Sequence, residues 1–139
     1  MHTFVLHKID QVKGKISFYK LEIDGKCDFD EFCEAFETAD EKKILLTLYA
    51  IMDSVANLSL LPKTKFRELK GRKKSDKIKD YEIKKDTIRI YLFKDVVGNI
   101  VVFGSSKQNQ KEDIARLRKL KEEYIKSKSY DNKRRTPQK

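Results

Sequence analysis

Residues 79–103 read KDYEIKKDTIRIYLFKDVVGNIVVF, and this stretch decides the fold class. Apolar residues stand at every second position between 87 and 93, namely Ile88, Ile90 and Leu92. A period of two is typical of a β-strand with one buried face. Turn sequences lie at 85–86 and 97–99. The stretch therefore predicts a meander of three antiparallel strands, over 79–84, 87–93 and 100–103.

The residues before this meander predict two strands and two helices. Residues 3–9 and 16–23 are rich in β-forming residues and are separated by a turn, which favours a hairpin. A short helix is expected to begin at Asp28, where acidic residues precede apolar residues at helical spacing. Thr38-Ala-Asp-Glu41 is a capping box, and it predicts a core-facing helix that ends near Asn57.

A short strand at 65–69 and a final helix complete the predicted order, which is β β α α β β β β α. The helix is expected to begin at residue 109 or 110 and to lose its apolar periodicity after Ser127. Lys121 falls in its apolar stripe, and we expect only the stem of that side chain to be buried. This order predicts an α+β fold with a twisted antiparallel sheet, helices on one face, an N-terminal helical hairpin and a C-terminal helix.

A chain of 139 residues suits one domain, which we place at residues 1–128. Residues 1–15 are interpreted as an added N-terminal strand. Residues 129–139 are polar and basic, and we expect them to form a disordered tail. The chain contains no apolar run long enough to cross a bilayer, and its first residues do not resemble a signal peptide. We therefore expect a cytoplasmic protein that does not bind to a membrane.

The net charge of +10 is concentrated in the second half of the chain. Residues 1–60 contain 7 Lys and Arg against 11 Asp and Glu, whereas residues 61–139 contain 25 against 11. This asymmetry favours a polyanionic partner, most often a nucleic acid. Charge alone leaves an anionic membrane surface and a merely solvated basic surface as alternatives, and of the two possible partners we expect nucleic acid.

The cysteines and histidines do not predict a metal site. Cys27 and Cys33 are six residues apart, a spacing that suits no common metal site, and the histidines are His2 and His7. We expect the cysteines to be small, reduced, buried side chains. The sequence contains neither a phosphate-binding glycine loop nor the pattern of a catalytic triad. No cofactor or metal is therefore expected.

Strand alternation places chemically active side chains on the sheet face opposite the core. If the strands at 79–84 and 87–93 pair, this face carries Glu82, Lys84, Arg89 and Tyr91, and we expect it to be open. RNA can be cleaved without metal when a base takes the 2′-hydroxyl proton, cations stabilise the phosphate and an acid protonates the 5′-oxygen. The face offers candidates for each role. The alternative is a face whose charges pair with one another and with water.

Basic residues before, between and after these strands are candidates for binding RNA. The residues predicted to do so are Lys65, Arg67, Lys70, Arg72, Lys73, Lys74, Lys107 and Lys111.

Several short motifs follow one another along the chain. They are FYKLE at 18–22 followed by Asp24-Gly25, DEF at 30–32, KFRELKG at 65–71, YEIK at 81–84, IRIY at 88–91, and IVVFG at 100–104 followed by Lys107 and Gln110-Lys111. In this order and spacing, from about Ile16 to Ile125, the chain resembles the RelE/ParE toxin superfamily. The resemblance is greatest to its HigB-like branch, which includes phage Gp49-like proteins.

The resemblance implies the toxin of a type II toxin–antitoxin system, a ribosome-dependent mRNA endonuclease that a cognate antitoxin neutralises, typically one of helix-turn-helix type. Arg89 matches the strand arginine that contacts the scissile phosphate in the family, and Lys84 matches a basic position that neutralises charge. Glu82 lies where some members carry a catalytic lysine and many HigB-like members carry glutamate. Lys107 matches the basic turn before the last helix.

The chain also departs from the family pattern. Some relatives use a histidine or tyrosine near the C-terminus as an acid, but no histidine follows His7, and the available phenols are Tyr91, Tyr124 and Tyr130. Gln108 replaces the second lysine after the last strand. Two alternatives therefore stay open: a toxin of this fold that acts on another target, such as DNA gyrase, and a nucleic-acid-binding module without catalytic activity.

Overall fold

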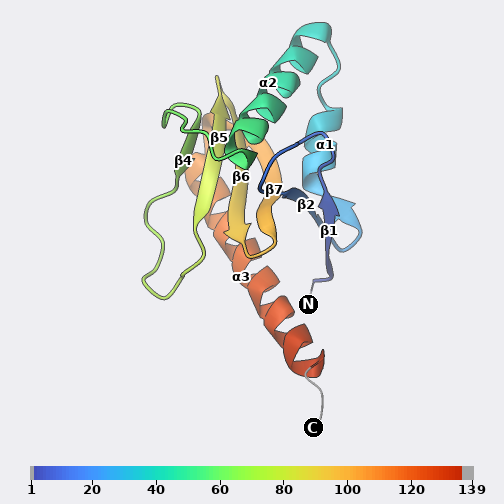
Figure 1. Ribbon diagram of the computed structural model, residues 1–139, viewed down its shortest axis with the longest axis vertical. Helices are drawn as coiled ribbons and strands as arrows, with labels where there is room; N and C mark the ends of the chain where they lie inside the picture. Colours follow the sequence, from blue (N-terminus) through green and yellow to red (C-terminus); the bar gives the residue numbers. More distant parts are fainter. Residues whose placement is uncertain (1, 136–139) are drawn as a thin grey trace.

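The computed structural model describes residues 2–135, and its elements follow the predicted order with one short strand added (Figure 1). The strands are β1 (Phe4–Lys8), β2 (Phe18–Ile23), β3 (Lys26–Cys27), β4 (Phe66–Glu68), β5 (Asp80–Lys85), β6 (Ile88–Asp95) and β7 (Gly98–Ser106). The helices are α1 (Asp28–Glu34), α2 (Ala39–Ala56), the 3-10 turn η1 (Lys107–Asn109) and α3 (Gln110–Arg135). The chain is thus an α+β protein.

The strands form one mixed sheet in the order β1-β2-β7-β6-β5-β4, and β3 pairs with β2. β1 and β2 form the predicted hairpin, and β5, β6 and β7 form the predicted meander. β2 and β7 are parallel, with Phe18 opposite Asn99 and Lys20 opposite Val101. The expectation of a purely antiparallel sheet is therefore wrong. Parallel neighbours need a long crossover, and here α1, α2 and four strands separate β2 from β7 along the chain.

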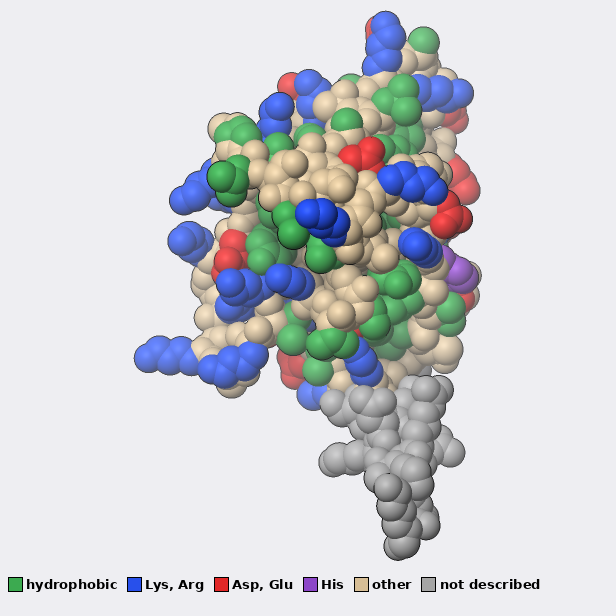
Figure 2. All heavy atoms as spheres, viewed as in Figure 1, with side chains coloured by type: hydrophobic (Ala, Val, Ile, Leu, Met, Phe, Trp, Pro, Cys, Tyr) green, Lys and Arg blue, Asp and Glu red, His purple; other side chains and the backbone are tan. Residues whose placement is uncertain are grey.

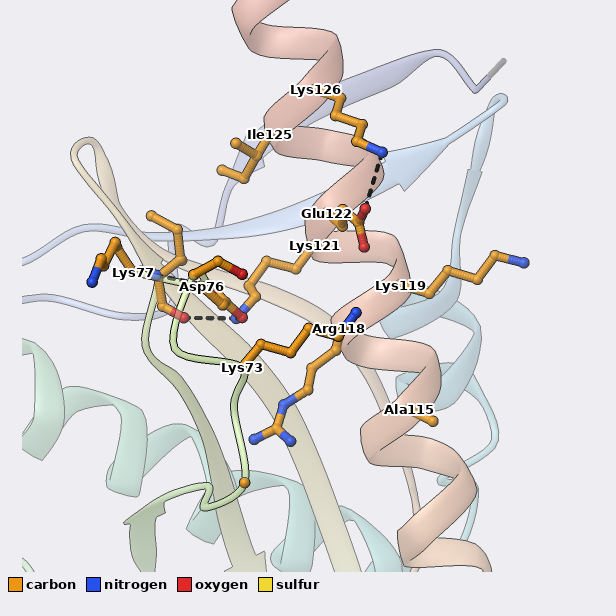
Figure 3. Close-up of a pocket in the computed structure, with 13 residues that line it drawn as sticks. Lys73, Asp76, Lys77, Ala115, Arg118, Lys119, Lys121, Glu122, Ile125 and Lys126 are labelled. Carbon is orange, nitrogen blue, oxygen red and sulfur yellow. Dashed lines mark hydrogen bonds and ion pairs between the residues drawn. The ribbon is translucent and has the colours of Figure 1, made fainter.

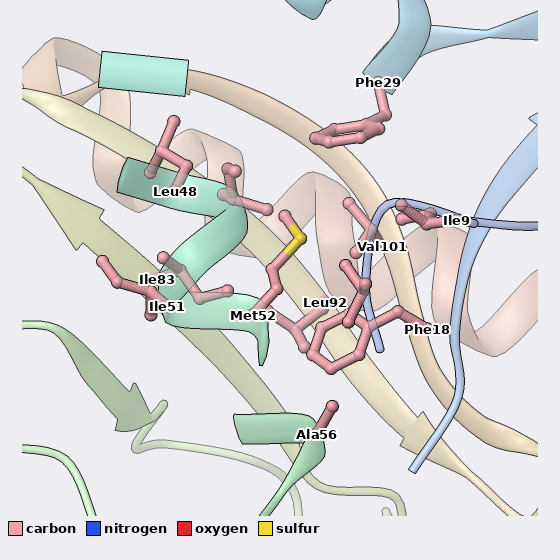
Figure 4. Close-up of a cluster of buried hydrophobic side chains, with 12 residues drawn as sticks. Ile9, Phe18, Phe29, Leu48, Ile51, Met52, Ala56, Ile83, Leu92 and Val101 are labelled. Atoms are coloured by element: carbon pink, nitrogen blue, oxygen red, sulfur yellow. The ribbon is translucent and has the colours of Figure 1, made fainter. Parts of the chain in front are cut away.

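Helices cover both faces of the sheet, not one as expected. Residues of α1 and α2, including Phe29, Leu48 and Met52, pack over one face in a cluster with Ile83 and Val101 (Figure 4). The helix α3 covers the other face, where its residues pack in a second cluster that contains Leu21, Tyr91, Phe93, Phe103, Leu117 and Tyr124. The aromatic residues of β6 explain the difference, because they give its second face apolar surface that a helix can bury.

Local signals position the first two helices. The Thr38 hydroxyl accepts a hydrogen bond from the Glu41 backbone N–H at 3.1 Å, and the Glu41 carboxylate accepts one from the Thr38 N–H at 3.0 Å, so the predicted capping box is confirmed. α1 begins at Asp28 as predicted, but Cys27 is its N-cap and makes no side-chain cap hydrogen bond. A Cβ at Gly104 would lie 2.7 Å from the ring of Phe32, so glycine allows α1 to pack directly on β7.

Both ends of the described chain differ from expectation. Ile9 and Val12 are buried in the first cluster, so residues 1–15 contribute to the core as well as adding an edge strand. α3 continues to Arg135, beyond the end predicted near Ser127, and overlaps the expected disordered tail at 129–135. Residues 136–139 of that tail lie outside the described residues. No helix in the described part combines the length and apolar character that crossing a membrane requires.

Candidate functional site

The four candidate catalytic residues lie together on one face of β5 and β6, as alternation predicts. In the antiparallel register, Glu82 is opposite Tyr91 and Lys84 is opposite Arg89. Ser105 of β7 is opposite Arg89 and extends the same row. A register shift follows Tyr91, so the regular pairing that holds these side chains on one face ends there.

This face is not open, which corrects the prediction. Glu82 and Tyr91 have no exposed surface, and Arg89 is 4% exposed, whereas Lys84 is half-buried. The first turn of α3 lies over them, and Gln110 donates hydrogen bonds to both Glu82 carboxylate oxygens, at 3.2 and 2.9 Å. The alternation of residues along a strand predicts which side chains share a face, but it does not predict whether a helix distant in sequence covers that face.

Contacts from two elements satisfy the Glu82 carboxylate. Arg67 of β4 donates from Nε to Oε1 at 2.5 Å, and its side chain is 38% exposed. The amide of Gln110 approaches from the helix side. A carboxylate buried in this way needs such partners, because an unpaired buried charge is strongly unfavourable.

The arginine beside this carboxylate is turned toward the backbone. Arg89 Nη1 donates to the carbonyl oxygens of Asp86, at 2.6 Å, and Ile88, at 2.9 Å. Its Nε is buried without a hydrogen-bond partner among the described residues. The planar guanidinium therefore keeps unused donor capacity in the site.

The Tyr91 hydroxyl is also buried without a hydrogen-bond partner among the side chains and backbone groups that the structure describes. Burial raises the pKa of Tyr91 to about 12, and the negative charges of Glu82 and Asp113 add to the rise. Arg89 and the nearby Ser105 oppose this shift without reversing it. The phenol therefore remains protonated at neutral pH and can donate a proton but not accept one.

Residues from the start of α3 complete the site, and sequence reasoning missed their role. Ser105 donates to the Asp113 carboxylate at 2.5 Å, which joins β7 to α3 beside Arg89. The sequence predicts a helix start at residue 109 or 110, but it does not predict that the first turn of this helix covers the Glu82 face. Gln110 and Asp113 follow the end of β7 by only four and seven residues. So short a connection indicates that the start of α3 must lie close to the sheet.

The candidate RNA-binding residues fall into two groups around this site. Lys65, Arg67 and Lys111 lie next to the Glu82 face, and Lys65 and Lys111 are exposed. Four others lie on the loop between β4 and β5, where Lys70, Lys73 and Lys74 are exposed and Arg72 pairs with Glu68 at 2.9 Å. Figure 2 shows Lys and Arg side chains projecting along the side of the molecule where Figure 1 places β4 and this loop. The side chain of Lys107 lies outside the described residues.

A second buried cluster of charges lies further along α3. Asp80 of β5 accepts hydrogen bonds from Lys121 Nζ at 2.9 Å and from Arg118 Nε at 3.0 Å. Lys121 also pairs with Asp76 at 2.6 Å, so the expectation that it contributes only its stem is wrong (Figure 3). Burial alone would raise the pKa of Asp76, but the hydrogen bonds from Lys121 and from the Ile78 N–H outweigh it and lower that pKa. This network anchors the β4–β5 loop to α3.

Among the side chains that the structure describes, no three of His, Cys, Asp or Glu gather closely enough to hold a metal ion. Cys27 and Cys33 are half-buried free thiols, and burial raises both thiol pKa values, which leaves them protonated and unreactive at neutral pH. Comparison with protein-family models, with curated proteins and with solved structures finds no match for this chain.

Proposed function

We propose that this chain is a toxin of the RelE/ParE type, with α1 and α2 as its helical hairpin, and that it cleaves mRNA on the ribosome. The observation that carries the proposal is the pair of buried, unpartnered polar atoms, Arg89 Nε and the Tyr91 hydroxyl, beside Glu82 and Lys84. A buried polar group without a partner costs about 1–3 kcal/mol, so folds retain few of them. Such groups are expected where a substrate will supply the partner.

The chemistry follows from these four side chains and needs no metal. The Glu82 carboxylate takes the proton of the 2′-hydroxyl, and the 2′-oxygen attacks the phosphorus. Lys84 and Arg89 stabilise the negative charge that grows on the phosphate oxygens. The protonated phenol of Tyr91 gives its proton to the departing 5′-oxygen, which leaves a cyclic phosphate and a free 5′-hydroxyl. Tyr91 thus takes the acid role that the C-terminal residue has in some relatives.

Access to this face requires a movement of the first turn of α3. Gln110 and Asp113 hold that turn through hydrogen bonds to Glu82 and Ser105, and both bonds are part-buried. Lys65 and Lys111 are exposed at the edge of the face and are available to guide the RNA backbone. We propose that RNA bound on the ribosome replaces the contacts of this turn.

A cognate antitoxin, typically of helix-turn-helix type, is the partner that such a toxin needs in the cell. Among the alternatives, a nucleic-acid-binding module without catalytic activity is favoured by one observation, the burial of Glu82 and Arg89. That module would use the exposed lysines at the edge of the sheet and on the β4–β5 loop. A gyrase-directed toxin has no comparable observation in its favour.

The proposal is tested by single-turnover cleavage of mRNA on purified ribosomes. The full chain should cut mRNA, and its induction should stop translation and growth. Glu82→Gln should slow cleavage on the order of 10²–10⁴-fold, the usual contribution of a general base. Glu112→Gln, at an exposed position on α3, is the matched control and should cut at the original rate. Binding to ribosomes or RNA without cleavage would favour the binding module instead.

A further inference from the structure

A groove of about 740 Å³ lies between the β4–β5 loop and the middle of α3 (Figure 3). Residues such as Lys73, Asp76 and Ile78 form its loop side, and Arg118 and Ile125 belong to its helix side. None of the four candidate catalytic residues lines it. The groove is therefore a second feature of the molecule, separate from the Glu82 face.

The groove carries an excess of positive charge, and two of its cations, Arg118 and Lys121, are paired with the buried Asp80. Its lining includes Lys73, Lys77, Arg118, Lys119, Lys121 and Lys126, against the acids Asp76 and Glu122. Both acids are already paired, Asp76 with Lys121 at 2.6 Å and Glu122 with Lys126 at 2.9 Å. Three exposed lysines of the groove have no ion-pair partner among the described residues: Lys73, Lys77 and Lys119. These charges are available to a negatively charged ligand.

The groove combines this charge with an apolar surface. Ile78, Ala115 and Ile125 contribute apolar surface between the charged side chains, and none of the lining residues that the structure describes is aromatic. Proteins that bind single-stranded nucleic acid stack the bases on aromatic side chains, so this lining does not favour RNA. An amphipathic protein segment suits it better, because apolar side chains can fill the floor while carboxylates meet the lysines.

Ion pairs and hydrogen bonds hold the walls of the groove in place without a ligand. Arg118 Nη2 donates to the Lys70 carbonyl at 2.8 Å, and Lys121 Nζ donates to the Ile78 carbonyl at 2.6 Å. Both bonds connect α3 to the loop. A site whose walls are already ordered loses less conformational entropy when a ligand binds.

We propose that this groove binds an acidic, amphipathic segment of a partner protein. Binding of such a segment does not depend on the proposed function. Identification of the partner as the antitoxin does rest on it. An acidic segment bound there would lie beside the loop lysines and would shield part of the basic surface from RNA.

The test uses three fluorescent probes against the full chain, followed by anisotropy. Two are helical peptides with the same apolar pattern, one with glutamate and the other with glutamine at its polar positions, and the third is an oligouridylate. Ala115→Trp fills the groove, and the triple variant Lys73→Glu/Lys77→Glu/Lys119→Glu reverses its charge. Matched controls at exposed positions outside it are Ala50→Trp and Lys15→Glu/Lys42→Glu/Lys43→Glu. Circular dichroism confirms that every variant folds.

We expect the glutamate peptide to bind and the glutamine peptide to bind at least about tenfold more weakly. Each groove variant should weaken the glutamate peptide about tenfold or more, and each control should change it by less than about twofold. Absence of binding, or equal losses in the controls, overturns the proposal. If the groove variants weaken oligouridylate but not the peptide, the groove binds nucleic acid and the proposal is wrong. Cleavage is measured separately, so an inactive chain that still binds the peptide contradicts the proposed function alone.

Discussion

Asp80 and Glu82 stand two residues apart on β5, point to the same face and lie under the same helix, yet their surroundings differ. Around Asp80, the carboxylate accepts three hydrogen bonds from Arg118 and Lys121, and the lysine is further satisfied by Asp76 and a carbonyl. Around Glu82, the neighbouring Arg89 and Tyr91 each keep a buried polar atom without a partner. The cluster around Asp80 is a hydrogen-bonded network that stabilises the fold. The cluster around Glu82 keeps polar atoms whose hydrogen bonds a substrate could supply.

The largest loss of stability is expected when the hydrogen-bonded ion pairs around Asp80 are broken. Asp80→Ala leaves the ammonium of Lys121, which is 2% exposed, with fewer partners in a buried environment. Removing one partner of a buried ion pair costs about 3–5 kcal/mol, so the free energy of unfolding should fall by about that amount in urea titrations. Asp10→Ala, at an exposed position, is the control and should change it by less than about 0.5 kcal/mol. A similar small change for Asp80→Ala would contradict the structural role.

Loss of the Arg89 guanidinium should slow cleavage, and a lysine at the same position should not restore the rate. Arg89→Ala and Arg89→Lys should both slow single-turnover cleavage by about 10²–10³-fold, because lysine cannot present the forked guanidinium donors. The side chain is buried, so the alanine variant should also lose stability, which thermal melting measures in parallel. If Arg89→Lys cuts at the original rate, a single charge suffices and the forked contact is not used.

Tyr91→Phe should separate activity from stability. Removing an unpartnered buried hydroxyl should leave the free energy of unfolding unchanged or raise it by up to about 1 kcal/mol. Cleavage should fall by about 10²-fold if the phenol is the acid. An unchanged cleavage rate would remove Tyr91 from the mechanism.

The pH dependence of stability gives Tyr91 a second test. Its pKa is raised from the ordinary value of 10.0 to about 12, so the folded state holds the proton more tightly than the unfolded state. The stability that this provides is complete below pH 10 and is lost as the pH rises toward 12. Tyr91→Phe should therefore reduce the alkaline loss of stability. It should not abolish that loss, because burial also raises the pKa of Tyr49 and Tyr124.

The smallest effect is expected at the contact that closes the Glu82 face. Gln110→Ala removes a neutral donor from a carboxylate and should lower stability by about 1–3 kcal/mol at most. Hydrogen exchange should quicken over residues 110–113, and cleavage should rise a few-fold if opening of this turn limits access. Gln108→Ala, outside the Glu82 contact, should change neither quantity. Slower cleavage in Gln110→Ala would show that the glutamine positions Glu82 instead of covering it.

Local pattern predicted much of this site. The alternation in 79–93 correctly placed Glu82, Lys84, Arg89 and Tyr91 on one face, because the period of a strand is a property of the backbone alone. The burial of that face could not be predicted in the same way. It depends on where α3 packs after leaving β7, and the stripe on α3 that directs the packing includes Lys121, whose charge is neutralised by residues about forty positions away.

The sequence by itself determined the order of the elements, the two hairpin regions, the capping box of α2 and the sharing of faces along each strand, since all of these follow from contacts between residues close in the chain. The tertiary structure alone decided that β2 runs parallel to β7, that α3 covers the second face, and that Asp80 is satisfied while Arg89 and Tyr91 are not. Pairing and covering depend on which distant apolar and charged surfaces meet, and those long-range contacts have no signature in the local pattern of either partner.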